Sequence, residues 1–417
     1  MQFCIQDPSY NNSKYLHETL LSECIGGCSG AGMYAFATKD GIELFMEDEN
    51  FKKFIQKSTF LLIVGMDDIT NVRAIETLKE LQSKYGKNLK VKAYIHNSRK
   101  STFHPKLSWF KKDNGGVLIL GSGNLTQQGL RQNREAFTVT ECDEEAMDKV
   151  VKEWNQWLQH SEPFLFDISE DIVMERAKQN ITKLKAVYEV QKTTSGKSSV
   201  ASYSALAELF KNQPKDKKFD KRKDESEVKT TKLVQDKVKV DYVIEDEIDV
   251  DLEYWYTDLE SEVLLAEIPK NGSRMSQVIF DKKSFEEFFG ATCGENGSYR
   301  ILFRNVNVDG SLEKIEVRQS VSVESHNYRF ELDAAKGVVY PNGEERPIGV
   351  FAKVSDRDFL YEIVMPDNQV YQQVVSVMSS KQPDSRALRR LTYICSEIYK
   401  DTSDLAIWKR LDVEDDE

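Results

Sequence analysis

The chain has 417 residues, of which 40% are hydrophobic and 30% are charged, a composition ordinary for globular proteins. The length predicts two or three domains rather than one. The formal net charge of −12 excludes a protein that is basic throughout, so contact with nucleic acid would require basic residues gathered on one face.

The sequence contains no run of about 18 apolar residues, so no membrane helix is predicted. The N-terminal sequence also lacks the apolar segment of a secretion signal. Six cysteines in a chain of this length do not predict a disulfide framework and fit a reducing cytosol. We therefore expect a cytoplasmic protein with no membrane partner.

The first elements in chain order predict an α/β domain over residues 1–190. Residues 60–65 form a short apolar run of strand length, 71–85 carry helical periodicity, and 89–96 alternate like a strand. This strand–helix–strand order predicts a βαβ unit within a sheet that contains parallel pairing.

A hairpin and a helix are expected next in this domain. The strand-like runs LSWFKK and GGVLILGS flank residues 113–116, an Asp-Asn-Gly-Gly sequence typical of hairpin turns. Residues 144–160 then carry the apolar stripe of an amphipathic helix.

The composition changes near residue 190. Residues 191–241 are rich in Lys, Asp, Glu, Ser and Thr and poor in apolar side chains, which predicts a charged linker. A short helix over 203–210 and weak contact of the linker with a DNA backbone both remain open.

The last part of the chain is expected to be mostly β, with a helical end. Turn signals separate seven strand-like runs within 242–380, which predict a barrel or a sandwich: EVLLAEIP, QVIFD, SYRILFRNVNV, EKIEVRQSVSV, NYRFEL, PIGVFAKV and FLYEIVMP. Residues 381–417 predict a helical segment with an acidic tail.

Five polar residues between positions 104 and 135 form the strongest chemical signal. His104 and Lys106 are two apart on a predicted strand and therefore point to the same face. Ser122 and Asn124, also two apart, follow the next strand, and Glu135 begins a further apolar stretch. Together they supply an imidazole, an ammonium, a hydroxyl, a carboxamide and a carboxylate.

This set of groups suits phosphoryl transfer without a metal ion. Lys106 and Asn124 can hold the non-bridging oxygens, and Ser122 can add a hydrogen bond. His104 can attack phosphorus, while Glu135 accepts from the other ring nitrogen and fixes the tautomer. A second, protonated histidine would then donate to the leaving oxygen.

Other interpretations of these residues are weaker. A nucleotide-binding loop would need a GxxxxGK pattern followed by Ser or Thr, and none is present. A metal-dependent nuclease would need a D/E-x-K triplet after Pro366-Asp367, and Cys24 and Cys28 have no matching pair at zinc spacing. We therefore expect no metal and no cofactor.

The sequence His104-Pro-Lys106 followed by Gly121-Ser-Gly-Asn124 resembles the HxK…GSxN signature of the phospholipase D superfamily. Glu135 stands where single-motif nucleases of that superfamily carry a glutamate. The resemblance implies a phospholipase D-like α/β fold and a histidine nucleophile. Many members have Asp at the fifth position after the lysine, where this chain has Lys111; single-motif nucleases often lack that Asp.

The number of motif copies predicts the oligomer. Enzymes of this superfamily use two facing histidines, and none of the other histidines here has a lysine two residues later: His17, His96, His160 and His326. The chain therefore holds half a site, and we expect a homodimer with one active site shared between the subunits. His96 precedes the motif and either approaches the site or has a structural role at a strand end.

The chain also resembles the BfiI/NgoFVII-like restriction endonucleases. The segments AEIPKNGSRMSQVIFDKKSFEEFFG and RPIGVFAKVSDRDFLYEIVMP look like the recognition domain of that group, which implies a β pseudobarrel that reads DNA in the major groove. Arg, Asn and Gln read base edges. The candidate DNA-binding residues are Lys270, Asn271, Ser273, Arg274, Gln277, Arg304 and Arg318, with ordinary solvated strand ends as the alternative.

These observations favour a metal-independent, sequence-specific DNA endonuclease acting in restriction or phage defence. A DNA-binding component of a defence complex with conditional nuclease activity is an alternative, and a phospholipase is a weaker one. Arg131 and Arg134 are candidates for contact with DNA phosphates or for surface salt bridges. The aromatic residues of the β region are expected in the core: Trp255, Phe285, Phe288 and Phe289.

Overall fold

A computed structural model describes residues 1–10, 13–67, 69–96, 101–180, 255–270, 277–319, 328–342, 344–383 and 387–412. They fall into two compact units. The first unit comprises Met1–Phe3, Gly26–Gln127 and residues from Phe137, described to 180; the second comprises Cys4–Ile25, Gln128–Ala136 and the C-terminal part. The expected linker and the helix within it lie outside the described residues, so the domain boundaries stay a prediction.

An eight-stranded mixed sheet has the strand order β1-β7-β6-β5-β2-β3-β4-β8. Its central strands β2, β3 and β4 are parallel, whereas β5 pairs antiparallel with β2 and with β6. The strands are β1 (Gln2–Gln6), β2 (Ser29–Tyr34), β3 (Thr59–Gly65), β4 (Leu89–Tyr94), β5 (Lys106–Lys112), β6 (Gly115–Gly121), β7 (Glu135–Cys142) and β8 (Leu165–Asp167). The expected βαβ unit and the hairpin are confirmed.

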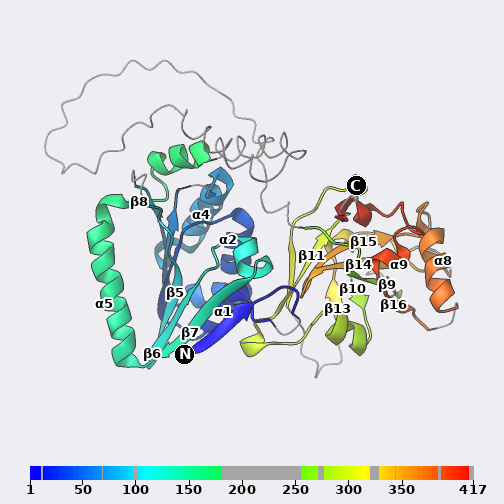
Figure 1. Cartoon of the computed structure of the whole chain (residues 1–417), viewed down its shortest axis with the longest axis horizontal. Coiled ribbons are helices and arrows are strands. Elements are labelled where there is room, and N and C mark those ends of the chain that lie inside the picture. The colour runs from blue at the N-terminus through cyan, green and yellow to red at the C-terminus, as the bar shows by residue number, and fades with distance from the viewer. Residues whose placement is uncertain are drawn as a thin grey trace, which may run out of the picture. The chain divides into compact units, whose positions relative to one another are not determined.

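Helices cover both faces of this sheet, with α5 on one face and α2 and α4 on the other (Figure 1). They are α2 (Lys39–Met46), α3 (Glu49–Ile55), α4 (Val72–Tyr85) and α5 (Glu144–Ser161). The side chains of Asn71 and Asp143 accept from the third residue of α4 and of α5, which explains where these helices begin. Both helices expected from the sequence are therefore confirmed.

Large aromatic side chains fill the space between sheet and helices. Phe45, Phe51 and Phe60 form edge-to-face contacts on the face of α2. Trp109 and Trp154 meet edge to face at 6.0 Å between ring centres under α5. Burying one such side chain contributes roughly 1.5–3 kcal/mol, so these clusters fix the strands that carry the site.

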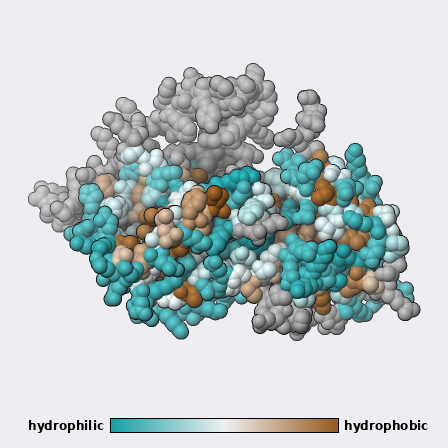
Figure 2. All heavy atoms as spheres, turned by 60° about the horizontal axis from the view of Figure 1, so that its bottom comes forward, coloured by the Kyte–Doolittle hydropathy of each residue, from teal (hydrophilic) through white to brown (hydrophobic). Residues whose placement is uncertain are grey.

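The outer surface is mainly hydrophilic on the face shown in Figure 2, where hydrophobic side chains occur in small groups. Within the described ranges, no helix has both the length and the apolar character needed to cross a bilayer.

The second unit contains a six-stranded sheet in the order β12-β11-β15-β14-β9-β16 and a two-stranded sheet of β10 and β13. All seven strands expected here are confirmed: β9 (Glu262–Glu267), β10 (Gln277–Ile279), β11 (Arg300–Asn305), β12 (Glu316–Gln319), β13 (Arg329–Glu331), β14 (Ile348–Ser355) and β15 (Asp358–Val364). Both sheets are open, and the described strands form no closed barrel. The four aromatic residues expected in the core are all buried.

The C-terminal segment differs from the helix expected over 381–417. Residues Arg390–Ile394 form strand β16, which pairs antiparallel with β9 at the edge of the sheet. The sequence RLTYI is rich in β-branched and aromatic residues, and an open sheet edge stabilises it as a strand. Helix is found instead at α8 (Tyr371–Lys381) and in the short α9 (Cys395–Ile398).

A buried cluster of charges lies inside the second unit. Arg131, in the helical turn η2 (Gln128–Gln132), is 0% exposed; its guanidinium donates to Asp358 at 2.8 Å and to Glu18 of helix α1 (Leu16–Glu23) at 3.3 Å. Arg357 donates to both oxygens of Glu18 at 3.0 Å. Burial raises the pKa of Asp358, and the charge of Arg131 opposes this. A phosphate contact by Arg131 is therefore wrong, because its guanidinium is enclosed.

We expect Arg131→Ala to lower the free energy of unfolding by about 3–5 kcal/mol, because it leaves the buried Asp358 carboxylate without its cation and Glu18 with Arg357 alone. Urea unfolding of the full chain measures this. Arg134→Ala is the control, since the Arg134 side chain is 70% exposed and lies 3.4 Å from Asp7; about 1 kcal/mol or less is expected there. Equal, small losses in both variants would contradict the structural role of Arg131.

Candidate active site

Four of the expected catalytic residues come from adjacent strand ends. The parallel strands β2, β3 and β4 all end at one edge of the sheet, and β5 begins at this edge with Lys106 opposite Tyr34. Strand β6 ends there, because Leu120 pairs with Leu107. His104 and Lys106 before and at the start of β5 therefore reach the same edge as Ser122 and Asn124 after β6. Such carboxyl edges commonly hold ligand sites.

The imidazole of His104 and the ammonium of Lys106 are in direct contact. Lys106 Nζ lies 2.8 Å from His104 Nδ1 and 2.9 Å from Nε2. An ammonium has only donors, and which of the two ring nitrogens accepts depends on the tautomer of His104. His104 is exposed and Lys106 half-buried. The ring that sequence analysis assigned as a nucleophile is thus accessible.

Phe36, which follows β2, connects His104 with Asn124. Its ring meets the His104 ring edge to face, with 6.1 Å between centres. Its backbone N–H donates to Asn124 Oδ1 at 3.3 Å. Because the amide oxygen is the acceptor here, the orientation of the carboxamide is set and Nδ2 is the end that can donate to a bound anion.

Backbone pairing holds the segment that carries Asn124. Leu125 donates to the carbonyl of Phe36 at 3.1 Å, and Thr38 donates to the carbonyl of Leu125 at 3.1 Å. Gly41 in the first turn of α2 packs against this segment so closely that an added Cβ would lie 2.4 Å from the Leu125 oxygen. Only glycine allows this approach.

Buried hydrogen bonds support the other side of the same segment. Thr70, which is 0% exposed, accepts from the backbone N–H of Ala37 at 3.1 Å and donates to the Gly65 carbonyl at 2.8 Å. Asn180, in a helix over 171–180, donates to the Thr70 carbonyl at 2.9 Å. The end of β2 is therefore fixed to the end of β3.

Asp67 holds the backbone next to His104. One of its oxygens accepts from the Phe103 N–H at 2.9 Å and lies 3.2 Å from His96 Nε2. The Phe103 ring stacks on Tyr94 with 4.2 Å between centres. His96 thus lies just after strand β4, in contact with Asp67. Of the two roles expected for it, this position agrees with the structural one.

Ser122 and Glu135 are the two expected catalytic residues whose side chains remain to be placed. Ser122 is exposed in the turn after β6. Glu135 is the first residue of β7 and belongs to the second compact unit, where its carboxylate accepts from Asn133 Nδ2 at 3.1 Å. Its expected hydrogen bond to His104 stays a prediction.

Three of the seven candidate DNA-binding residues fall outside the described part of the chain: Asn271, Ser273 and Arg274. Gln277 begins β10, where it pairs with Glu331. Lys270 is exposed, with its ammonium 5.8 Å from the centre of the Tyr340 ring.

The two candidate arginines of the second unit have structural contacts. Arg304 is 4% exposed, donates to the Glu313 carbonyl at 2.8 Å and lies over the Trp255 ring. Arg318 donates to Asp333 at 2.8 Å and to the Glu331 carbonyl. Arg304 is thus buried and Arg318 is held by a carboxylate and a carbonyl, and contact of either side chain with DNA stays a prediction.

Sequence reasoning missed Phe36, Asp67 and Thr70. Phe36 acts mainly through its backbone N–H, which leaves no signature in sequence. Asp67 had a usable signal, because a carboxylate two residues after a buried parallel strand lies at the end of the sheet where sites form.

Comparison with known proteins agrees with this fold. Residues 60–160 match the family model described as "Cardiolipin synthase, PLD-like domain". No curated protein matches the chain in sequence.

Similar solved structures include two named Nuc and NucT. Nuc of Salmonella typhimurium, described as a phospholipase D family member, is 14% identical over 40% of this chain and 95% of its own, with a TM-score of 0.30. NucT of Helicobacter pylori is 16% identical over 36% of this chain and 88% of its own, with a TM-score of 0.26. Phosphatidylserine synthase of Haemophilus influenzae is 13% identical over 44% of this chain and 45% of its own, with a TM-score of 0.29.

We expect Gly41→Ala to displace the Asn124 segment, since the new Cβ would overlap the backbone of Leu125 and Thr126. The free energy of unfolding should fall by about 1–3 kcal/mol, and the side-chain amide signals of Asn124 should move in a nitrogen–proton NMR spectrum. Glu43→Ala on the same helix is the control. If both variants behave alike and the Asn124 signals stay in place, the close approach of α2 does not position this residue.

Proposed function

We propose that this chain, which contains a phospholipase D-like domain, is a phosphodiesterase that cleaves DNA without a metal ion. The observation that carries the proposal is the contact of the Lys106 ammonium with the exposed His104 ring, beside an Asn124 carboxamide of fixed orientation. These are a nucleophile and two donors for a tetrahedral phosphate, presented at one edge of the sheet.

In the proposed reaction a His104 ring nitrogen attacks phosphorus. The new P–N bond forms as the P–O bond to the leaving oxygen breaks, giving a phosphohistidine. Lys106 and Asn124 donate to the non-bridging oxygens, where negative charge builds up. Water then attacks phosphorus and gives a proton to the group that had protonated the leaving oxygen, the P–N bond breaks, and His104 is regenerated.

Lys106 has a second role before substrate binds. Its ammonium lies against the ring nitrogens that must supply the attacking lone pair. A phosphate oxygen is a stronger acceptor than a neutral imidazole, since it carries charge. The arriving phosphate would therefore draw Lys106 away and free the nucleophile.

The leaving oxygen needs a proton from an acid, and the chain carries a single HxK motif. We propose that His104 of a second subunit supplies it, so that a C2 homodimer forms one shared centre. The mostly β second unit would then recognise DNA, as in BfiI/NgoFVII-like restriction endonucleases, with Lys270 and the segment from Asn271 to Gln277 as contacts. With this arrangement we propose a role in restriction or phage defence, which rests on the resemblance to that group.

Cleavage of plasmid DNA should persist in excess EDTA, since no step uses a metal ion. His104→Ala should lower the rate by at least about 10³-fold, while DNA binding remains. Wild-type protein quenched during turnover should carry an acid-labile DNA adduct that His104→Ala lacks. His160→Ala, an exposed histidine of α5, is the matched control and should behave as wild type. Loss of cleavage in EDTA would refute the mechanism.

Subunit mixing tests the shared centre. The protein should have the mass of a dimer, twice the 48.0 kDa of one chain. Equal amounts of wild type and His104→Ala, allowed to exchange subunits fully, should retain about a quarter of the activity, because only that fraction of dimers has both rings. Retention of half would instead assign the acid to the same chain, with His96 as the nearest candidate in sequence.

A further inference from the structure

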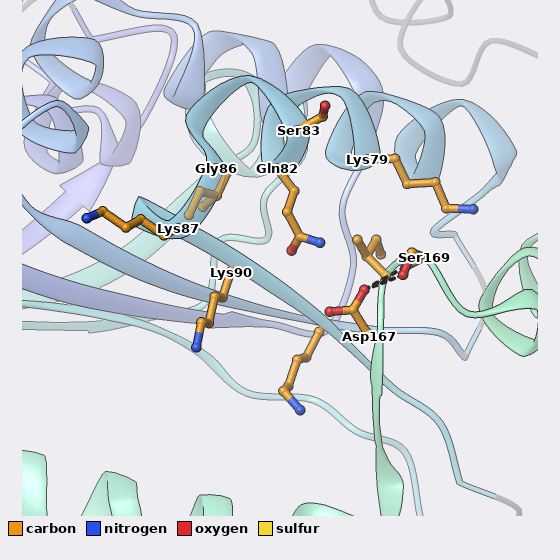
Figure 3. Close-up of a pocket in the computed structure, with 11 residues that line it drawn as sticks. Lys79, Gln82, Ser83, Gly86, Lys87, Lys90, Asp167 and Ser169 are labelled. Atoms are coloured by element: carbon orange, nitrogen blue, oxygen red, sulfur yellow. Dashed lines mark hydrogen bonds between the residues drawn. The ribbon is translucent and has the colours of Figure 1, made fainter.

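A cleft of about 720 Å³ lies at the far edge of the eight-stranded sheet, lined by the C-terminal half of α4, the start of β4 and the end of β8. Four lysines line it: Lys79, Lys87, Lys90 and Lys92. Figure 3 shows it with Gln82 of α4 pointing to the strand. Gln82 accepts from the Val91 N–H at 2.6 Å, which fixes α4 to β4 where β8 no longer pairs.

The cleft is locally basic in an acidic chain. Residues 79–92 contain five lysines and one glutamate. Lys84 is 2.7 Å from Glu47, but within the described ranges the four lysines of the cleft form no ion pair with a carboxylate. Asp167 is the one acid of the lining, and it accepts from the backbone and hydroxyl of Ser169 at 3.0 and 2.6 Å.

The end of α4 does not account for this charge. A helix C-terminus carries partial negative charge, which nearby Lys84 and Lys87 can offset. Lys90 and Lys92 lie instead on β4, where they alternate with the buried Leu89, Val91 and Ala93. Like charges gathered on a surface repel each other, and a bound polyanion removes that repulsion.

The lysines are spread out rather than convergent. In Figure 3, Lys79 and Lys87 point in opposite directions along α4, and Lys90 points away from the helix. From Lys79 to its end at Tyr85, α4 rises roughly 9 Å, and Lys87 lies beyond this end in the turn Gly86–Asn88. One DNA strand has a phosphate about every 3.4 Å along its axis, so this spacing fits several phosphates of a polymer and not a cradle for one.

We propose that this lysine cleft binds the phosphate backbone of a nucleic acid outside the cleavage centre. The proposal rests on the proposed function and names a second contact for the same substrate. Strand β4 begins at the cleft and ends at the same end of the sheet as β2 and β3, where the candidate active site lies. Its six residues span roughly 20 Å. A duplex cut at His104 could therefore extend to the lysines, which would raise affinity without touching the reacting atoms.

A nucleic acid suits the lining better than an anionic membrane does. The apolar residues of the lining, Leu89 and Ile168, are 1% and 0% exposed. The lining therefore presents no apolar side chain for insertion into a bilayer, and its charges are arranged around a hollow. Membrane binding remains an outcome that the experiment detects.

The test replaces all four cleft lysines with Gln in a full-length His104→Ala background, so that DNA binds without being cut. The control carries four Lys→Gln changes of equal net charge at lysines that are paired with carboxylates: Lys39, Lys52, Lys111 and Lys149. Fluorescence anisotropy gives the Kd for a 30-base-pair duplex over a series of salt concentrations. Thermal melting shows that both variants are folded.

The cleft variant should bind about 10- to 100-fold more weakly, and its slope of log affinity against log salt should shrink by up to about 3.6, or 0.9 per lost contact. The control should keep the parent slope. Equal slopes in cleft variant and parent overturn the proposal even where wild type cuts DNA, whereas a smaller slope upholds it even where wild type never cuts. The cleft variant could instead keep the parent slope for DNA and no longer sediment with phosphatidylglycerol vesicles. That result would overturn the proposal in favour of membrane binding.

Discussion

Hydrogen bonds between two short segments outside the sheet hold the candidate site together. The segment Phe36–Thr38 after β2 and the residue Leu125 after β6 pair as though their strands continued, although β5 lies between those strands. This pairing brings Asn124 to the start of β5 and fixes the direction of its amide. The glycine of α2 and the buried hydroxyl of Thr70 then close the segment from both sides.

The proposed chemistry depends on which groups this frame holds in place. Asn124 and the backbone of Phe103 are fixed by hydrogen bonds, so the donors and the nucleophile loop are preorganised. Lys106 differs, because its long side chain lies against the ring it would later release. In the proposed reaction, preorganised donors lower the barrier, and Lys106 exchanges its contact with the ring for a contact with phosphate.

The sequence predicted much of the fold but few of the contacts around the candidate catalytic groups. The expected elements within 60–160 and the seven later strands were found because their periodicity is local. Strand β16 was expected as helix, since its conformation depends on an edge of β9 more than 100 residues away. Arg131 was misplaced for a similar reason: its partners Glu18 and Asp358 are remote in sequence, so nothing near it indicated burial. Phe36 escaped because its contribution is a backbone N–H.

The acidic net charge is compatible with a polyanion as substrate, because the excess is not spread evenly. Residues 241–253 contain seven acidic residues and 412–417 contain five, with no lysine or arginine in either segment. These twelve equal the whole excess, so the remainder of the chain is balanced. At physiological salt, charges separated by more than about 8 Å are largely screened. A polynucleotide therefore responds to the lysines it approaches, and the four cleft lysines, which form no ion pair with a carboxylate among the described residues, act as a basic surface whatever the sign of the whole chain.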